Sequence, residues 1–190
     1  MEQKNKLYIK NMVCNRCIMV VREEFKKLGI EPIQVELGIV ETATPLTAHQ
    51  RESIKSALNP LGFELIDDKR IRIIEQVKNA IIELIYTKNG DLKVNLSDYL
   101  AAKVHHDYSY ISNLFSEIEN TTIEKYFIAQ KTERVKELLV YDELSLSEIA
   151  DLLNYSSTAH LSTQFKKVTG LTPSHFKKVK ENKRKPLDQV

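Results

Sequence analysis

The stretch SEIADLLNYSSTAHLSTQFKKVTGLTPSHFKK, residues 147–178, decides the fold of the C-terminal part of the chain. Its first helix is marked by apolar residues on one face: Ile149, Leu152 and Leu153. Ser145 or Ser147 is suited to cap this helix, and residues 154–156 have the composition of a turn. A second helix is expected over residues 158–169. The stretch therefore predicts a helix–turn–helix.

The second helix of this stretch has one apolar and one polar face. The residues expected to be buried follow the spacing i, i+4, i+7: Leu161, Phe165 and Val168. The outward face holds small, polar or basic side chains: Thr158, Ala159, His160, Thr163, Gln164 and Lys167. Such groups suit base edges and phosphates, so the pattern favours DNA binding. The alternative is an ordinary three-helix core whose polar residues are only solvated.

The pattern F-K-K-x-x-G-x-T-P-x-x-F-K at residues 165–177 resembles the second helix–turn–helix of AraC/XylS-type transcription regulators. The resemblance implies an all-α DNA-binding domain, here residues 70–190, with two helix–turn–helix units joined by a long helix. Double-stranded DNA is then the expected partner. RNA polymerase would be a second partner if the protein is an activator, and a homodimer remains open.

A second copy of the motif lies about 50 residues upstream, as the resemblance requires. Aligned on Phe115 and Phe165, the copies pair Ala101 with Ala150, Ile111 with Leu161, Asn120 with Gly170 and Tyr126 with Phe176. Residues 123–141, which hold no Gly or Pro, are expected to form the connecting helix. Two such units are expected to enter successive major grooves on one face of the duplex.

Residues on both copies are candidates for DNA contact. Base contacts are expected from Ser109, Ser112, Asn113, Thr158, Ala159, His160 and Thr163, and phosphate contacts from Lys166 and Lys167. In the first copy, Ser116 and Glu117 stand in place of the two lysines, which departs from the family pattern. The first copy therefore either reads bases by hydrogen bonding or mainly braces the second.

Charge also differs between the copies. Residues 95–151 carry five Lys or Arg and eleven Asp or Glu, whereas residues 155–190 carry eight and two. Phosphate neutralisation is thus expected mainly on the second copy and on the basic run KKVKENKRK that follows it. The alternative for that run is a solvated tail.

The N-terminal part contains a different signal, the pair Cys14 and Cys17. The pair follows a short apolar strand, residues 7–9, and precedes an amphipathic helix with apolar Ile18, Val21, Phe25 and Leu28. Two thiols three residues apart can chelate one soft cation, and a helix N-terminus is expected to lower their pKa.

The surrounding pattern predicts an α+β unit of order β-α-β-β-α-β. It comprises a hairpin over residues 33–43 around Gly38, a capping box at Thr47 and Gln50, a helix over residues 48–58 and a last strand over residues 63–66. With M-x-C-x-x-C in the first loop, this order resembles heavy-metal-associated domains, which are ferredoxin-like metallochaperone modules. The resemblance implies a sensor domain over residues 1–69, Cys14 and Cys17 as ligands of Cu(I), and Met12 packed beneath the site. Asn11 replaces the usual Gly before that Met.

Three interpretations of the cysteine pair remain open. The pair binds Cu(I), with Zn(II) less favoured because two ligands are visible; or it forms a reversible disulfide; or the domain is an inherited oligomerisation or partner-binding module without metal. The short connection of residues 67–70 suggests that an event at the thiols is coupled to the helical domain.

Composition sets the remaining expectations. The 190 residues carry 28 basic and 26 acidic side chains and two cysteines, with no signal-peptide pattern and no long apolar run. A cytoplasmic location is expected. An enzyme is not, because beyond the cysteine pair the sequence shows no nucleophile–base set and no phosphate loop. The rival to a regulator is a metal carrier or thiol-redox protein whose helical part is only a docking module.

Overall fold

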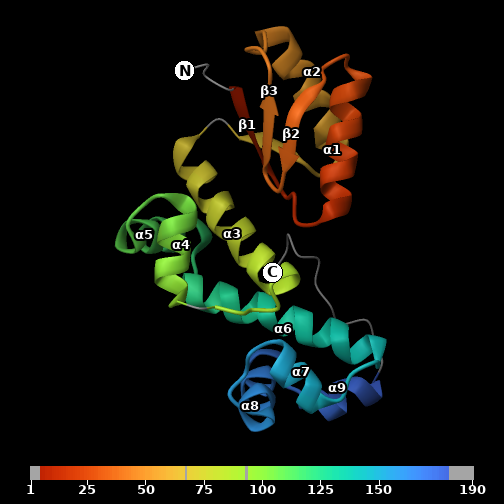
Figure 1. Cartoon of the computed structure of the whole chain (residues 1–190), viewed down its shortest axis with the longest axis vertical. Helices are drawn as coiled ribbons and strands as arrows, with labels where there is room; N and C mark the ends of the chain where they lie inside the picture. Colours follow the sequence, from red (N-terminus) through yellow and green to blue (C-terminus); the bar gives the residue numbers. More distant parts are fainter. Residues whose placement is uncertain (1–4, 67, 93, 180–190) are drawn as a thin grey trace. The chain divides into compact units, whose positions relative to one another are not determined.

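The computed structural model describes residues 5–66, 68–92 and 94–179 (Figure 1). The chain divides into two compact units, Met1–Asn79 and Ala80–Val190. The division falls inside helix α3, Lys69–Thr87, whereas the sequence places the domain boundary at residue 69, where this helix begins. The first half of α3 is grouped with the N-terminal unit because it packs on that unit's sheet.

The N-terminal unit is a four-stranded antiparallel sheet with two helices. Its elements are β1 (Asn5–Lys10), α1 (Asn15–Lys27), β2 (Pro32–Glu36), β3 (Ile39–Thr42), α2 (Ala48–Leu58), η1 (Asn59–Leu61) and β4 (Glu64–Ile66). The strands lie in the order β2-β3-β1-β4, so the first and last strands pair although most of the unit separates them. In the central pair, Leu7 of β1 faces Val40 of β3. The capping box predicted at Thr47 and Gln50 is confirmed.

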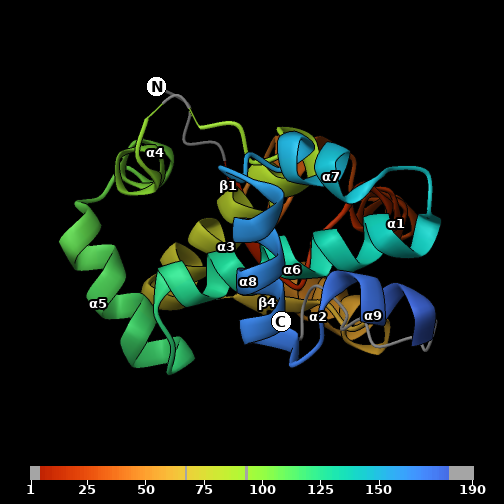
Figure 2. The same ribbon diagram turned by 90° about the horizontal axis from the view of Figure 1, so that it is seen from below.

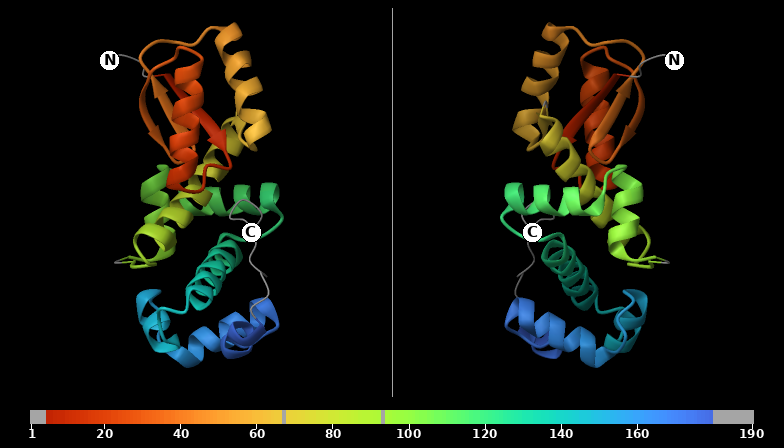
Figure 3. Two further views of the ribbon diagram at one scale, coloured as in Figure 1. Left: turned by 90° about the vertical axis from the view of Figure 1, so that its right-hand side faces the viewer. Right: turned by 90° about the vertical axis from the view of Figure 1, so that its left-hand side faces the viewer.

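Helices α1 and α2 pack side by side on one face of this sheet (Figure 3). The core between them is built from alternate strand residues and one stripe of each helix: Leu7, Ile9, Val35, Val40, Val21, Phe25, Ile54 and Leu58. Met12 is fully buried in the same core, as the resemblance implied. Leu28 is not part of it: the side chain is 37% exposed, because α1 ends at Lys27 and Leu28 is its C-cap.

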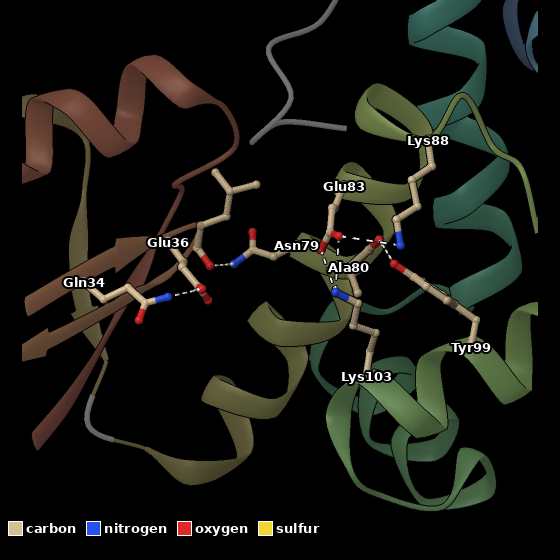
Figure 4. A network of polar contacts seen from close by, with 9 residues as sticks. Gln34, Glu36, Asn79, Ala80, Glu83, Lys88, Tyr99 and Lys103 are labelled. Atoms are coloured by element: carbon tan, nitrogen blue, oxygen red, sulfur yellow. Dashed lines mark hydrogen bonds and ion pairs between the residues drawn. The ribbon is translucent and has the colours of Figure 1, made fainter. Parts of the chain in front are cut away.

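The opposite face of the sheet is met by the first half of α3. The Arg72 guanidinium lies 4.9 Å from the centre of the Tyr8 ring, and its Nε donates to the carbonyl of Ile66 at 3.1 Å. Further along the helix, Asn79 Nδ2 donates to the carbonyl of Leu37 at 3.2 Å (Figure 4). Of residues 67–70, which were expected to connect the domains, Lys69 and Arg70 belong to α3. Residue 67 lies outside the described residues.

The C-terminal unit is helical. After the second half of α3 it contains α4 (Leu96–Val104), α5 (Tyr108–Glu119), α6 (Ile123–Tyr141), α7 (Leu146–Leu152), α8 (Thr158–Thr169) and α9 (Pro173–Val179). Helix α6 runs from the α4–α5 pair to the α7–α9 group and packs against helices of both (Figure 2). Its bounds are those predicted for the connecting helix. Among the described residues, no helix combines the length and apolar character needed to cross a membrane.

The second half of α3 is tied to α4 by polar contacts. Lys103 Nζ lies 3.0 Å from Glu83 Oε2, and the Tyr99 hydroxyl donates to the carbonyl of Ala80 at 3.4 Å (Figure 4). Burial, with the Glu83 charge second, raises the pKa of Tyr99 to about 12. This phenol therefore stays protonated and remains a donor at physiological pH.

Candidate nucleic-acid interface

Two helix pairs with matching local geometry flank α6. The rings of Phe115 and Tyr126 lie 5.5 Å apart at 61°, and those of Phe165 and Phe176 lie 5.5 Å apart at 77°. Each edge-to-face pair joins the helix after the turn to the helix that follows it. The alignment of the two sequence copies therefore corresponds to equivalent aromatic contacts in space.

The ends of α5 and α8 also match. Asn120 ends α5 with φ 52°, and Gly170 ends α8 with φ 78°, so both C-caps are left-handed. Asn and Gly are the residues that adopt this conformation most readily, which explains the substitution between the copies.

The start of α7 is fixed by Ser145, whose side chain forms a capping box with Glu148. Of the two serines considered for this cap, Ser145 fills it.

Helix α8 exposes the polar face expected of it. Its N-cap is Ser157, which accepts a hydrogen bond from the amide of His160 at 3.1 Å. The predicted contact residues are all exposed: Thr158, Ala159, His160, Thr163, Lys166 and Lys167. Buried Leu161 and Phe165 hold the opposite face in the core. These side chains therefore share one accessible surface.

Val168 was expected in the core but is 45% exposed. The helix ends one residue later, and Phe176 of α9, rather than Val168, packs against Phe165. Gln164 is also placed differently from the prediction. It is half-buried rather than outward-facing, and its Oε1 accepts a hydrogen bond from the Tyr155 hydroxyl at 2.9 Å.

Tyr155 lies at the centre of a cluster that the sequence assigned only to a turn. Its ring meets the His160 ring edge-on, with centroids 5.5 Å apart and planes at 83°. The Lys131 ammonium of α6 lies 4.0 Å from the centre of the Tyr155 ring and 3.5 Å from the carbonyl oxygen of Asn154. Burial raises the pKa of Tyr155 and lowers the pKa of Lys131 to about 8. A tyrosine within the turn was the one local signal in the sequence, and it does not point to Lys131, which lies far away along the chain.

Helix α5 places its predicted residues less uniformly. Ser109 and Asn113 are exposed, whereas Ser112 is half-buried. The Tyr108 hydroxyl donates to Glu124 Oε1 at 2.5 Å, and this hydrogen bond lowers the pKa of Glu124. Burial first, and then Glu124, raises the pKa of Tyr108 to about 12. A carboxylate thus stands beside the start of α5, where a phosphate would be repelled.

The two cysteines lie close together at the start of α1. Cys14 is its N-cap, and the Cys14 and Cys17 Sγ atoms are 3.5 Å apart. Both are free thiols and half-buried. The expectation of a lowered pKa is wrong for Cys17: burial raises the pKa of this thiol and outweighs the backbone hydrogen bonds that oppose it. Among the described residues, no group of three or more His, Cys, Asp or Glu could hold a metal ion.

Comparison with known proteins identifies a domain in the C-terminal part of the chain. Residues 100–178 match the family model described as "Helix-turn-helix domain". The Msm operon regulatory protein of Streptococcus mutans is 27% identical over 147 residues, covering 73% of this chain and 52% of its own. The xylose operon regulatory protein of Escherichia coli K12 is 29% identical over 186 residues, covering 88% of this chain and 47% of its own. The chain thus spans about half the length of these two relatives.

A crystal structure of a DNA-binding transcriptional dual regulator from Escherichia coli K-12 aligns with 55% of this chain and 92% of its own, at 18% identity and a TM-score of 0.48. The family model identifies residues 100–178 as a helix–turn–helix domain, and the two curated relatives named above are operon regulatory proteins.

Proposed function

We propose that this protein binds duplex DNA sequence-specifically and regulates transcription in the manner of AraC-type regulators. The observation that carries the proposal is the exposed polar face of α8, which carries Lys166 and Lys167 in its last turn; Leu161 and Phe165 anchor the opposite face. Helices held rigidly in this way present side chains to the major groove in helix–turn–helix proteins. The names of the curated relatives, both operon regulators, support the same conclusion.

The side chains of α8 fall into two roles. Thr158, Ala159, His160 and Thr163 would read base edges, whereas Lys166 and Lys167 would neutralise phosphates. In the first unit, Ser109, Ser112 and Asn113 would contact bases without equivalent lysines. The Glu124 carboxylate beside Tyr108 makes this unit the weaker of the two on phosphates.

Selection from a random duplex library tests the proposal with the full chain. We expect a bipartite site that spans two successive major grooves. His160→Ala should relax base preference at one position. Lys167→Ala should weaken binding to all sequences and reduce the slope of log affinity against log salt by about one. Weak binding without preference would instead favour a metal carrier or thiol-redox protein. A homodimer and RNA polymerase remain proposed partners, the latter if the protein is an activator.

For the N-terminal unit, we infer a ferredoxin-like module of the heavy-metal-associated type. The element order β1-α1-β2-β3-α2-β4 and the sheet order β2-β3-β1-β4 support this inference. The donor set of two thiols fits a soft ion. The two Sγ atoms are 3.5 Å apart, so both can reach one ion.

Cys14 and Cys17 would hold Cu(I), which accepts two thiolate ligands. Zn(II) is less favoured because it prefers four ligands. The bound ion would supply a charge change at the start of α1 that controls DNA binding. Burial of Cys17 opposes thiolate formation, so metal binding must displace the proton and is expected to strengthen as pH rises.

An anaerobic titration of reduced protein with Cu(I) against a competing chelator tests this control, with Cys14→Ser/Cys17→Ser as the matched variant. One equivalent bound by the parent alone supports a metal site. DNA affinity is then measured with and without Cu(I). Equal Cu(I) binding by both proteins removes metal as the input and leaves a disulfide switch or a structural module.

A further inference from the structure

Tyr155 connects the turn before α8 to two residues of that helix, the exposed His160 and the half-buried Gln164. Its hydroxyl donates to Gln164 Oε1 at 2.9 Å, and its ring packs edge-on against His160. His160 and Gln164 are four residues apart, so they lie next to each other on the helix surface. Tyr155 itself is only 8% exposed. One buried side chain therefore restrains two neighbouring residues on the helix that would read DNA.

The position of Tyr155 is itself fixed from the side of α6. The Lys131 ammonium lies against the Tyr155 ring and contacts the carbonyl oxygen of Asn154. The Tyr155 amide donates to the carbonyl of Ala150 at 2.8 Å, which ties the residue to α7. Asn154 Nδ2 in turn donates to the carbonyl of Asn89 at 3.2 Å. The ring thus has a defined place before any DNA arrives.

The hydrogen bond to Tyr155 decides which end of the Gln164 amide is available to a partner. A glutamine that recognises adenine does so in a bidentate manner: its carbonyl oxygen accepts from N6 and its amide nitrogen donates to N7. Both atoms must then face the base together. In this protein the hydroxyl of the buried Tyr155 side chain donates to the carbonyl oxygen and so engages it. Among the described residues, no hydrogen bond uses Gln164 Nε2.

We propose that Tyr155 is a specificity-determining positioning residue, which holds Gln164 so that its amide nitrogen alone serves as a hydrogen-bond donor to a base. This inference rests on the proposed DNA-binding function of α8. Gln164 then favours a base edge that presents acceptors, guanine through O6 and N7 or thymine through O4. Adenine is disfavoured because the oxygen that would accept from N6 is engaged by Tyr155.

Duplex selection with the full chain tests the proposal at the position whose preference disappears in Gln164→Ala. The parent should prefer guanine or thymine there. Tyr155→Phe keeps the ring and frees the carbonyl oxygen, so the adenine fraction at that position should rise about fivefold or more, the lower range for one bidentate contact. In the Gln164→Ala background, Tyr155→Phe should cause no further change, because the residue acts through Gln164.

Two further variants separate positioning from folding. Tyr141→Phe removes a hydroxyl from an exposed tyrosine at the end of α6 and should leave base preference unchanged. Gln164→Glu keeps an acceptor for Tyr155 but has no donor, and should lose the preference for guanine or thymine. A salt slope equal to that of the parent is expected for Tyr155→Phe, since no phosphate contact is altered.

The outcomes distinguish this inference from the function on which it rests. A parent that selects no sequence overturns both. A parent that selects a site while Tyr155→Phe selects the same bases overturns the positioning role alone, as does a parent preference for adenine at the Gln164 position. An equal loss of affinity for all duplexes, with a lowered melting temperature, would make Tyr155 only a structural residue and also overturn the inference.

Discussion

Replacing Lys131 with methionine should change how stability depends on pH. Lys131 is 9% exposed, and among the described residues no carboxylate lies within ion-pair distance of its ammonium. Its polar surroundings are the Tyr155 ring face and the carbonyl oxygen of Asn154, with the Phe127 ring 5.8 Å away. Burial therefore lowers its pKa from the ordinary value of 10.5 to about 8.

The sign of the effect follows from proton uptake. Between about pH 8 and 10.5, the unfolded chain binds a proton at Lys131 that the folded chain has released. The free energy of unfolding of the parent should therefore rise with pH across this window. Each unit by which a pKa is lowered corresponds to about 1.4 kcal/mol. The fall of the Lys131 pKa from 10.5 to about 8 therefore changes the free energy of unfolding by about 3 kcal/mol at most. Attraction between the ammonium and the Tyr155 ring favours the charged form and so makes the pKa shift smaller than burial alone would, which reduces the expected change across this window to about 1–2 kcal/mol.

Urea unfolding followed by circular dichroism at several pH values measures this change. Below pH 8, the free energy of unfolding of Lys131→Met should exceed that of the parent. This excess should shrink by about 1–2 kcal/mol as the pH approaches 10.5. Lys167→Met, at an exposed lysine of α8, is the matched control and should show no such dependence. A difference for Lys131→Met that is constant with pH would show instead that burial does not lower the pKa of Lys131.

Three further substitutions should change stability in defined directions. Gly38 has φ +76°, and a Cβ there would lie 2.2 Å from Asn79 Nδ2. Gly38→Ala should therefore lower the free energy of unfolding by about 1–3 kcal/mol. An unchanged urea midpoint would contradict this close approach. Asn120→Gly should raise stability by up to about 1 kcal/mol, because glycine adopts the left-handed C-cap without strain. A lower melting temperature for this variant would show that Asn120 is not strained. Ser145→Ala removes one half of the capping box with Glu148 and should cost about 1 kcal/mol in urea unfolding, with no loss expected if the cap is not formed in solution.

The local signals in the sequence were sufficient for most elements. Helix α8 has the predicted bounds because Ser157 caps its start and Gly170 permits the left-handed turn at its end. The capping box at Thr47 likewise fixes the start of α2. These signals act over a few residues, so they can be recognised without knowing the tertiary structure.

The errors arise where tertiary contacts decide the outcome. Helical periodicity places Val168 on the buried face, but Phe176 from the next helix fills the space against Phe165. Gln164 has a polar side chain at an outward position, yet Tyr155 draws it inward. Proximity to a helix N-terminus predicted a lowered pKa for Cys17, but burial dominates. The cluster around Tyr155 could not be predicted because Lys131 is distant in sequence.

The most direct test of the account is the ratio of the affinities of the full chain for its selected duplex and for a scrambled duplex at one salt concentration. We predict a ratio of about 10³ or more, the range of specific DNA-binding proteins, and a clear fall in this ratio for His160→Ala and for Thr163→Ala. A ratio near one, unaffected by these two substitutions, would contradict the conclusion that α8 reads DNA sequence.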